Sequence, residues 1–217
     1  EEVPYSDVNY SKTAAGLVKA RLLGINTETV EKRGKTVAEF GKNLLHTLTT
    51  YAVDLVSQNG WLPLTPVEVI EAYEGRIINQ HPGSLDPGHI DFGGIGMYGK
   101  RVTAARLAYA WMAGKDYWTE ATTHHVTDQF DEGAIIRIEK LTFASLTRRM
   151  TLDELHDNPE RLIKETHVLA KSLLPLEHKN VIATLLGFAR DGSFTSFQRK
   201  KPLVSPADQR ILTQAKE

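Results

Sequence analysis

The sequence contains no cysteine among its 217 residues, which excludes disulfide bonds, thiolate catalysis and every zinc site built on sulfur. Its charges nearly cancel, with a formal net charge of −1 at pH 7, so it has no basic field to hold nucleic acid or an anionic membrane. No apolar run approaches the roughly 20 residues that span a bilayer, and no secretory signal is visible. We therefore expect a cytoplasmic protein that binds neither nucleic acid nor a membrane.

The residues that are present match an ordinary globular protein. Hydrophobic residues make up 41% and charged residues 24% of the chain, close to the globular average. A chain of this length builds one large domain or barely two. We predict a single domain over residues 1–200 and a polar C-terminal tail over residues 201–217. The first residue is Glu1 rather than Met, which is consistent with a start inside a longer gene product.

Helical and strand patterns alternate in the first half of the chain. A helix over 36–51, a strand over 53–56, a helix over 66–73 and a strand over 76–81 are typical of a parallel sheet with crossover helices. The fold class that we predict is α/β, with a mostly parallel twisted sheet, helices on both faces and a hairpin near the C-terminal part. The other predicted elements are helices over 14–23, 102–113, 159–174 and 176–189, a short strand over 27–30, hairpin strands over 119–126 and 134–141, and an edge strand over 193–197.

The end of the strand over 76–81 carries Asn79-Gln80-His81-Pro82. Residues i and i+2 on a strand point to the same face, and open α/β sheets bind ligands at the carboxyl ends of their strands. An amide beside an imidazole is suited to stabilising an oxyanion and moving a proton. The alternative is that Asn79 caps a turn and His81 is an ordinary surface residue.

The turn between the hairpin strands contains Asp131-Glu132-Gly133. An Asp in such a turn is usually a turn former, and that alternative stands unless Asp131 reaches His81. A carboxylate beside the imidazole would raise its pKa and fix its tautomer. His124 and His125 are neighbours on a strand and point to opposite faces, so we expect structural roles and no shared metal.

Together these motifs resemble the folate-dependent formyltransferases, and most closely the phosphoribosylglycinamide formyltransferases of purine synthesis, over roughly residues 5–190. The pattern Asn-x-His-Pro is followed by Thr-x-His-x-Val and then by Asp-x-Gly-x-Ile-Ile, here over 79–82, 122–126 and 131–136. The resemblance implies a Rossmann-like fold and formyl transfer from 10-formyltetrahydrofolate to a primary amine, with no metal. It also implies a small-molecule amine partner, glycinamide ribonucleotide first. We expect a monomer or a homodimer.

The resemblance also assigns roles to residues. Asn79 would hold the formyl oxygen, His81 would stabilise the oxyanion, and Asp131 would orient His81 and help move the proton. The folate-binding residues by this comparison are Trp61, Leu62, Leu64, Val126, Thr127, Asp128 and Phe130. The substrate-binding residues are Pro82, Gly83, Lys100, Arg101 and Glu165.

The chain also departs from the family pattern. The family's first strand and its phosphate-binding Gly-rich turn have no counterpart, because the chain opens at about the family's second strand. The glycines over 94–99 formally match a dinucleotide fingerprint but follow no predicted strand, which that fingerprint requires. With Lys100 and Arg101 they form a candidate phosphate cradle or a mobile lid. The alternatives left open are a formyltetrahydrofolate hydrolase, an amino-sugar N-formyltransferase and an inactive truncated homologue.

Overall fold

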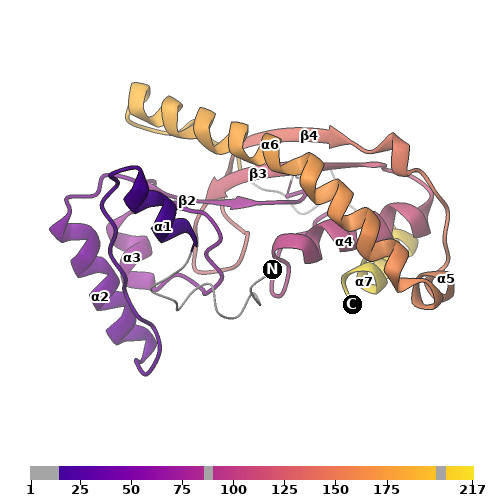
Figure 1. Cartoon of the computed structure of the whole chain (residues 1–217), viewed down its shortest axis with the longest axis horizontal. Helices are drawn as coiled ribbons and strands as arrows, with labels where there is room; N and C mark the ends of the chain where they lie inside the picture. Colours follow the sequence, from indigo (N-terminus) through magenta and orange to yellow (C-terminus); the bar gives the residue numbers. More distant parts are fainter. Residues whose placement is uncertain (1–14, 86–89, 199–203) are drawn as a thin grey trace. The chain divides into compact units, whose positions relative to one another are not determined.

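The computed structural model describes residues 15–85, 90–198 and 204–217 (Figure 1). The chain divides into two compact units. One contains the described residues up to 54 together with 65–74, and the other contains residues 55–64 and the described residues from 75 onward. In the described parts of the chain, no helix combines the length and the apolar character needed to cross a membrane.

The first unit contains the helices α1 (Ala15–Leu22), α2 (Val37–Thr50) and α3 (Val67–Ala72). A reciprocal capping box starts α2, because Thr36 Oγ1 accepts from the Glu39 N–H and the Glu39 carboxylate accepts from the Thr36 N–H. The three helices predicted here are confirmed. The strand predicted over 27–30 is wrong, since no strand lies among the described residues of this unit to pair with it.

The second unit is built on a four-stranded sheet in the order β1-β2-β3-β4. The strands are β1 (Val56–Gln58), β2 (Ile77–His81), β3 (Trp118–His125) and β4 (Ile135–Thr142). The α/β class and the β3–β4 hairpin are confirmed. The strand predicted over 53–56 begins later, at Val56, because the Val53 N–H still donates to the Leu48 carbonyl at the end of α2.

The sheet is mixed rather than mostly parallel. Only the β1–β2 pair is parallel, whereas β2–β3 and β3–β4 are antiparallel. The chain leaves β2 at its carboxyl end and re-enters the sheet at that same end, where His81 pairs with Thr122. The strand that follows the intervening helix α4 (Gly99–Ala113) therefore runs opposite to β2.

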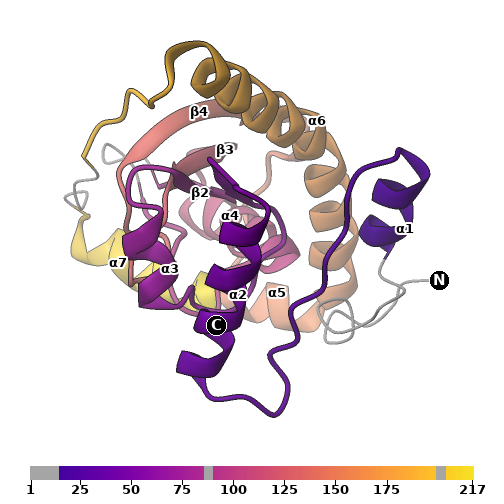
Figure 2. The same cartoon turned by 90° about the vertical axis from the view of Figure 1, so that its left-hand side faces the viewer.

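Helices cover both faces of this sheet, as predicted. Alternate residues of β3 point to opposite faces. Thr123 donates to Asn180 on α6 (Pro159–Asp191), whereas Trp118 lies under the Arg106 guanidinium of α4. Figure 2 shows α6 running beside β4. On the other face, the buried side of α4 packs its Trp111 against residues from α6 and from the short helix α5 (Leu152–Asp157).

Three C-terminal predictions differ from the structure. The helices predicted over 159–174 and 176–189 form one helix, α6, with Pro175 in its interior. The edge strand over 193–197 is reduced to a single bridge between Phe197 and Ile135. Within the predicted polar tail, residues 206–216 form α7 (Pro206–Lys216), capped by Ser205 and holding the buried Leu212. Residues 201–203 lie outside the described residues, and the domain boundary at residue 200 stays a prediction.

Asn180 joins α6 to the sheet through three hydrogen bonds. It is fully buried, its Oδ1 accepts from Thr123 Oγ1 at 2.8 Å, and its Nδ2 donates to the Ala121 carbonyl at 2.7 Å and to the Arg137 carbonyl at 3.3 Å. Asn180→Ala leaves these buried partners unsatisfied. We expect the free energy of unfolding to fall by about 2–3 kcal/mol in urea denaturation. The exposed Lys171→Ala on the same helix is the control, and equal losses in both variants would contradict this role.

Candidate active site

Two strands and one turn bring four polar side chains together. Asn79 and His81 lie on β2, His124 lies opposite Asn79 on β3, and Asp131 comes from the β3–β4 turn. Asp131 Oδ2 is 3.5 Å from His81 Nδ1, and Asp131 Oδ1 is 3.5 Å from His124 Nε2. The Asn79 amide nitrogen is 3.3 Å from His124 Nε2. The carboxylate therefore lies between two imidazoles, and the amide completes the cluster.

The conformation of the turn directs the Asp131 carboxylate inward. Asp131 has a φ of 57°, a left-handed conformation that Asp and Asn adopt more readily than most residues. Gly133 follows so close to the His125 carbonyl that a Cβ atom there would overlap it. The Gly94 N–H also donates to Asp131 Oδ2, at 3.0 Å. Backbone geometry and the Gly94 N–H therefore help to hold the carboxylate against the histidines.

Asp131 is ionised at neutral pH even though it is only 8% exposed. Burial alone would raise its pKa, but His81, His124 and the Gly94 N–H together lower the pKa of Asp131 to about 2. A fixed negative charge is thus available to stabilise a proton on either imidazole.

His81 is buried, with 2% of its surface exposed. Its Nε2 donates to the Phe92 carbonyl at 3.1 Å, and a carbonyl can only accept, so in the neutral ring Nδ1 is the free base that faces Asp131. Burial lowers the pKa of His81 below its usual range, and the charge of Asp131 opposes that shift. The neutral imidazole can therefore accept a proton at Nδ1, where the carboxylate stabilises it.

His124 belongs to the cluster, although the sequence predicts only a structural role for it. Its Nδ1 donates to the His125 carbonyl at 2.8 Å, which leaves Nε2 of the neutral ring to accept from Asn79. The sequence did contain evidence for a role of His124 in the site. The residue lies in the Thr-x-His-x-Val motif, and strand alternation places it on the same face of the strand as Thr122. The two neighbouring histidines do point apart, and the His125 ring packs against Phe194.

The two segments predicted to bind folate start at opposite ends of the strands, because one follows β1 and the other follows the antiparallel strand β3. Residues 59–64 follow the carboxyl end of β1, beside Asn79. Residues 126–130 follow β3, whose carboxyl end lies beside the amino end of β2, and the Val126 N–H continues the pairing with the Ile77 carbonyl. The loop then returns to place Asp131 at His81. The folate-binding role of both segments stays a prediction.

The residues predicted to bind the substrate are not all available for it. Lys100 Nζ donates to His167 Nε2 at 2.9 Å, and Arg101 donates to the Lys216 carbonyl at 3.2 Å. Gly83 lies so close to Val102 that a Cβ atom would overlap it, and its carbonyl accepts from Thr122. Pro82 follows β2 directly, and Glu165 lies on α6. The glycines over 94–99 follow a loop rather than a strand, as expected.

Across residues 15–85, 90–198 and 204–217, no three His, Asp or Glu side chains are grouped so that they could hold a metal ion. What the cluster offers is an amide donor, two imidazoles and an ionised carboxylate. Such a set can hold a carbonyl oxygen and accept a proton from an attacking nucleophile.

Comparisons with known proteins agree with this chemistry. The family model described as formyl transferase matches residues 7–170. The Arabidopsis thaliana protein named chloroplastic phosphoribosylglycinamide formyltransferase is 31% identical over 164 residues, which are 75% of this chain and 51% of that protein. The chain thus spans about half the length of that relative.

Two solved structures show the same fold. The phosphoribosylglycinamide formyltransferase of Coxiella burnetii superposes with a TM-score of 0.54 at 23% identity, covering 90% of this chain and 80% of its own. A formyltetrahydrofolate deformylase of Pseudomonas syringae gives 0.52 at 17% identity, covering 83% and 52%. With three quarters of its length matched by the family model, the chain belongs to the formyl transferase family.

Proposed function

We propose that this protein transfers a formyl group from 10-formyltetrahydrofolate to the primary amine of a small phosphorylated substrate, with glycinamide ribonucleotide of purine biosynthesis as the first candidate. The observation that carries the proposal is the ionised Asp131 held between His81 and His124, with Asn79 beside them. Membership of the formyl transferase family supports the reaction type. The name of the Arabidopsis relative supports the choice of amine.

The proposed reaction assigns a task to each group. The amine attacks the formyl carbon, a C–N bond forms, and the formyl oxygen becomes an oxyanion. Asn79 is partly exposed and donates to that oxygen, while the His81 Nε2–H stabilises the oxyanion in competition with the Phe92 carbonyl. The attacking nitrogen loses a proton to the imidazole cluster, where Asp131 stabilises the positive charge. The C–N bond to the folate then breaks, and the leaving nitrogen takes up a proton.

Binding roles follow the same proposal. Trp61, Leu62 and Leu64 line one side of the folate, and residues 126–130 line the other. Pro82, Gly83 and Glu165 contact the amine substrate, and Lys100 and Arg101 exchange their present partners for its phosphate. A cytoplasmic location and the choice between monomer and homodimer also stay predictions, and the Arabidopsis relative is named chloroplastic.

A formyltetrahydrofolate hydrolase is the second candidate. Water would replace the amine as the nucleophile, and the same cluster would serve. The observation in its favour is that both predicted phosphate-binding cations already have partners within the protein, His167 and the Lys216 carbonyl.

Absorbance at the folate chromophore distinguishes these candidates. A 10-formyl folate is mixed with the protein alone, with glycinamide ribonucleotide, and with an unphosphorylated primary amine. Deformylation that requires the ribonucleotide is the expected result. Turnover without any amine would replace the transferase by the hydrolase. Silence in every arm, with folate still bound, would favour an amino-sugar substrate or an inactive homologue.

A further inference from the structure

The loop over residues 91–94 contacts two of the proposed catalytic residues, His81 and Asp131. The Phe92 carbonyl accepts from His81 Nε2 at 3.1 Å, and the Gly94 N–H donates to Asp131 Oδ2 at 3.0 Å. Phe92 is fully buried, and its N–H donates to the Ser84 carbonyl. The position of this loop therefore fixes which nitrogen of His81 carries its proton and where the carboxylate points.

Lys216, at the end of α7, is bonded to the middle of that loop. Its Nζ donates to the Gly93 carbonyl at 3.1 Å and lies 6.0 Å from the centre of the Phe92 ring. Gly93 is the residue between the one that contacts His81 and the one that contacts Asp131. A single ammonium group thus acts on the segment that touches both.

Both ends of α7 are hydrogen-bonded to α4, so the position of Lys216 at the end of α7 is fixed by the fold. At the start of α7, Asp208 pairs with Lys115 at 2.8 Å and accepts from the Tyr109 hydroxyl at 3.1 Å. At its end, Arg101 of α4 donates to the Lys216 carbonyl. The two helices are therefore antiparallel neighbours, and Figure 1 shows α7 next to α4.

The middle of α7 is packed against the same loop. Leu212 is buried in a cluster with Phe92, Met97, Val102 and Tyr109. The Phe92 ring also packs edge-on against Tyr109 and lies 5.2 Å from the Arg106 guanidinium. Apolar packing and one charged hydrogen bond thus join α7 to the loop independently of each other.

We propose that α7 is a brace for the loop over residues 91–94, holding that loop against His81 and Asp131. Lys216 is then a positioning residue for these two side chains. The catalytic meaning of the brace rests on the proposed function, whereas the brace itself does not. This helix lies outside residues 7–170, which the family model matches. The family motifs therefore do not assign this role.

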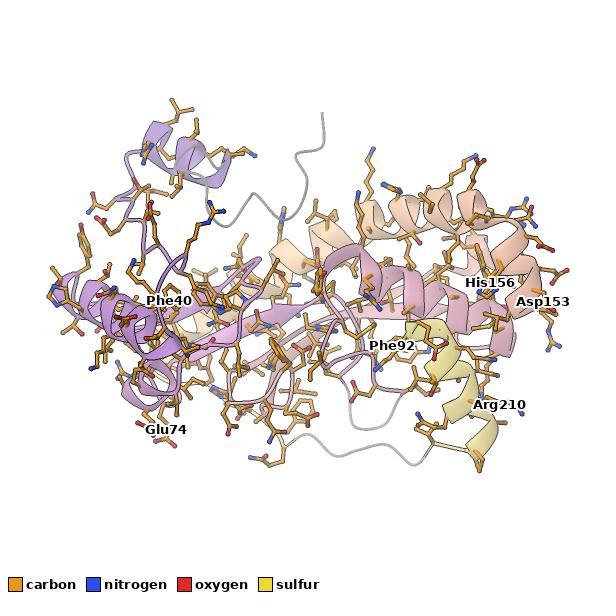
Figure 3. All side chains as sticks on the ribbon, turned by 90° about the horizontal axis from the view of Figure 1, so that it is seen from below. Phe40, Glu74, Phe92, Asp153, His156 and Arg210 are labelled. Carbon is orange, nitrogen blue, oxygen red and sulfur yellow. The ribbon has the colours of Figure 1, made fainter. Side chains whose placement is uncertain are left out.

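Three variants of α7 test the brace. Lys216→Met removes the bond to Gly93 and keeps most of the side chain. Leu212→Ala removes the apolar anchor and leaves every charge in place. Arg210→Met is the matched control, because Arg210 is exposed on the same helix and points away from Phe92 (Figure 3).

Two measurements by NMR read the loop directly. Amide hydrogen exchange at Gly93 and Gly94 is expected to quicken about tenfold in Lys216→Met and in Leu212→Ala. The His81 ring, identified by the resonance lost in His81→Ala, is expected to titrate at a higher pKa in both variants, because a looser loop admits water and relieves the burial that lowers this pKa. The titratable groups that act on His81 are Asp131, His124 and Asp91.

The outcomes separate a brace from a simple charge effect. Faster exchange and a raised His81 pKa in both variants, with Arg210→Met unchanged, would support the proposal. A raised pKa in Lys216→Met alone, with exchange unchanged, would show that Lys216 acts only through its charge and would overturn it. Unchanged values in all three variants would also overturn it. None of these readouts needs turnover, so an inactive wild-type protein would count against the proposed function and leave the brace standing.

Discussion

His81→Ala is expected to lower the turnover number by about 100- to 1000-fold, because the oxyanion loses a donor and the amine loses its proton acceptor. The same absorbance assay measures this loss. The Michaelis constants for the folate and for the amine are expected to change much less, since the buried ring contributes little surface to either ligand. Circular dichroism should show the native fold, because the deleted ring is small relative to the core of the unit.

The matched control is His156→Ala. His156 is an exposed histidine on α5 that makes none of the contacts described for the cluster, and it is labelled in Figure 3. It is expected to keep wild-type turnover. If His81→Ala kept near-normal turnover while folded, the assignment of the site to the end of β2 would be wrong, whatever the reaction.

The alternation of side chains along a strand was sufficient to predict that Asn79 and His81 lie side by side on one face. Residues i and i+2 share a face, and both side chains do lie in the cluster. Asp131 needed the family resemblance, because a carboxylate in a turn has no periodicity and its direction depends on a φ of 57°. His124 was quoted in that same resemblance, and the cross-strand register that pairs it with Asn79 gave it a role only once the structure was known.

Contacts between residues that are far apart in the sequence could not be predicted from the sequence. Residues 206–216 look like a polar tail because few of them are apolar. Ile211, Leu212 and Ala215 do pack, but the residues of the cluster that they join lie about a hundred positions earlier. The partners of Lys100 and Arg101 are similarly distant, on α6 and at the end of α7. A cationic pair that looked available for phosphate in the sequence is therefore already bonded in the fold.

Asp131→Asn is expected to be nearly as damaging to turnover as His81→Ala, about 100-fold or more, without displacing the backbone. Asn tolerates the left-handed conformation of this turn as well as Asp does, and its amide oxygen can still accept from the Gly94 N–H. What disappears is the negative charge between the two imidazoles. The protonated state of the cluster then loses the counter-charge that lies between the two imidazoles.

The pH dependence of turnover is expected to change in a defined direction in Asp131→Asn. The Asp131 charge raises the pKa of His81 against the lowering effect of burial, so removing that charge moves this pKa further down. If the neutral ring accepts the proton, activity falls on the acidic side of that pKa. The acidic limb of the profile is therefore expected to move to lower pH in Asp131→Asn, at a much reduced maximum rate. An unmoved limb would contradict a direct electrostatic contact between the two groups.

Stability offers an independent check of the same charge. The pKa of Asp131 is lowered from 3.8 to about 2 in the folded protein, so its ionised form stabilises the fold at every pH above its unfolded value. That stabilisation, about 2 kcal/mol, is lost as the pH falls from about 4 to about 2. Urea unfolding should show the wild type losing about this much more free energy across that interval than Asp131→Asn. Asp153→Asn, an exposed change on α5, should follow the wild type, because a solvated carboxylate gains little from folding.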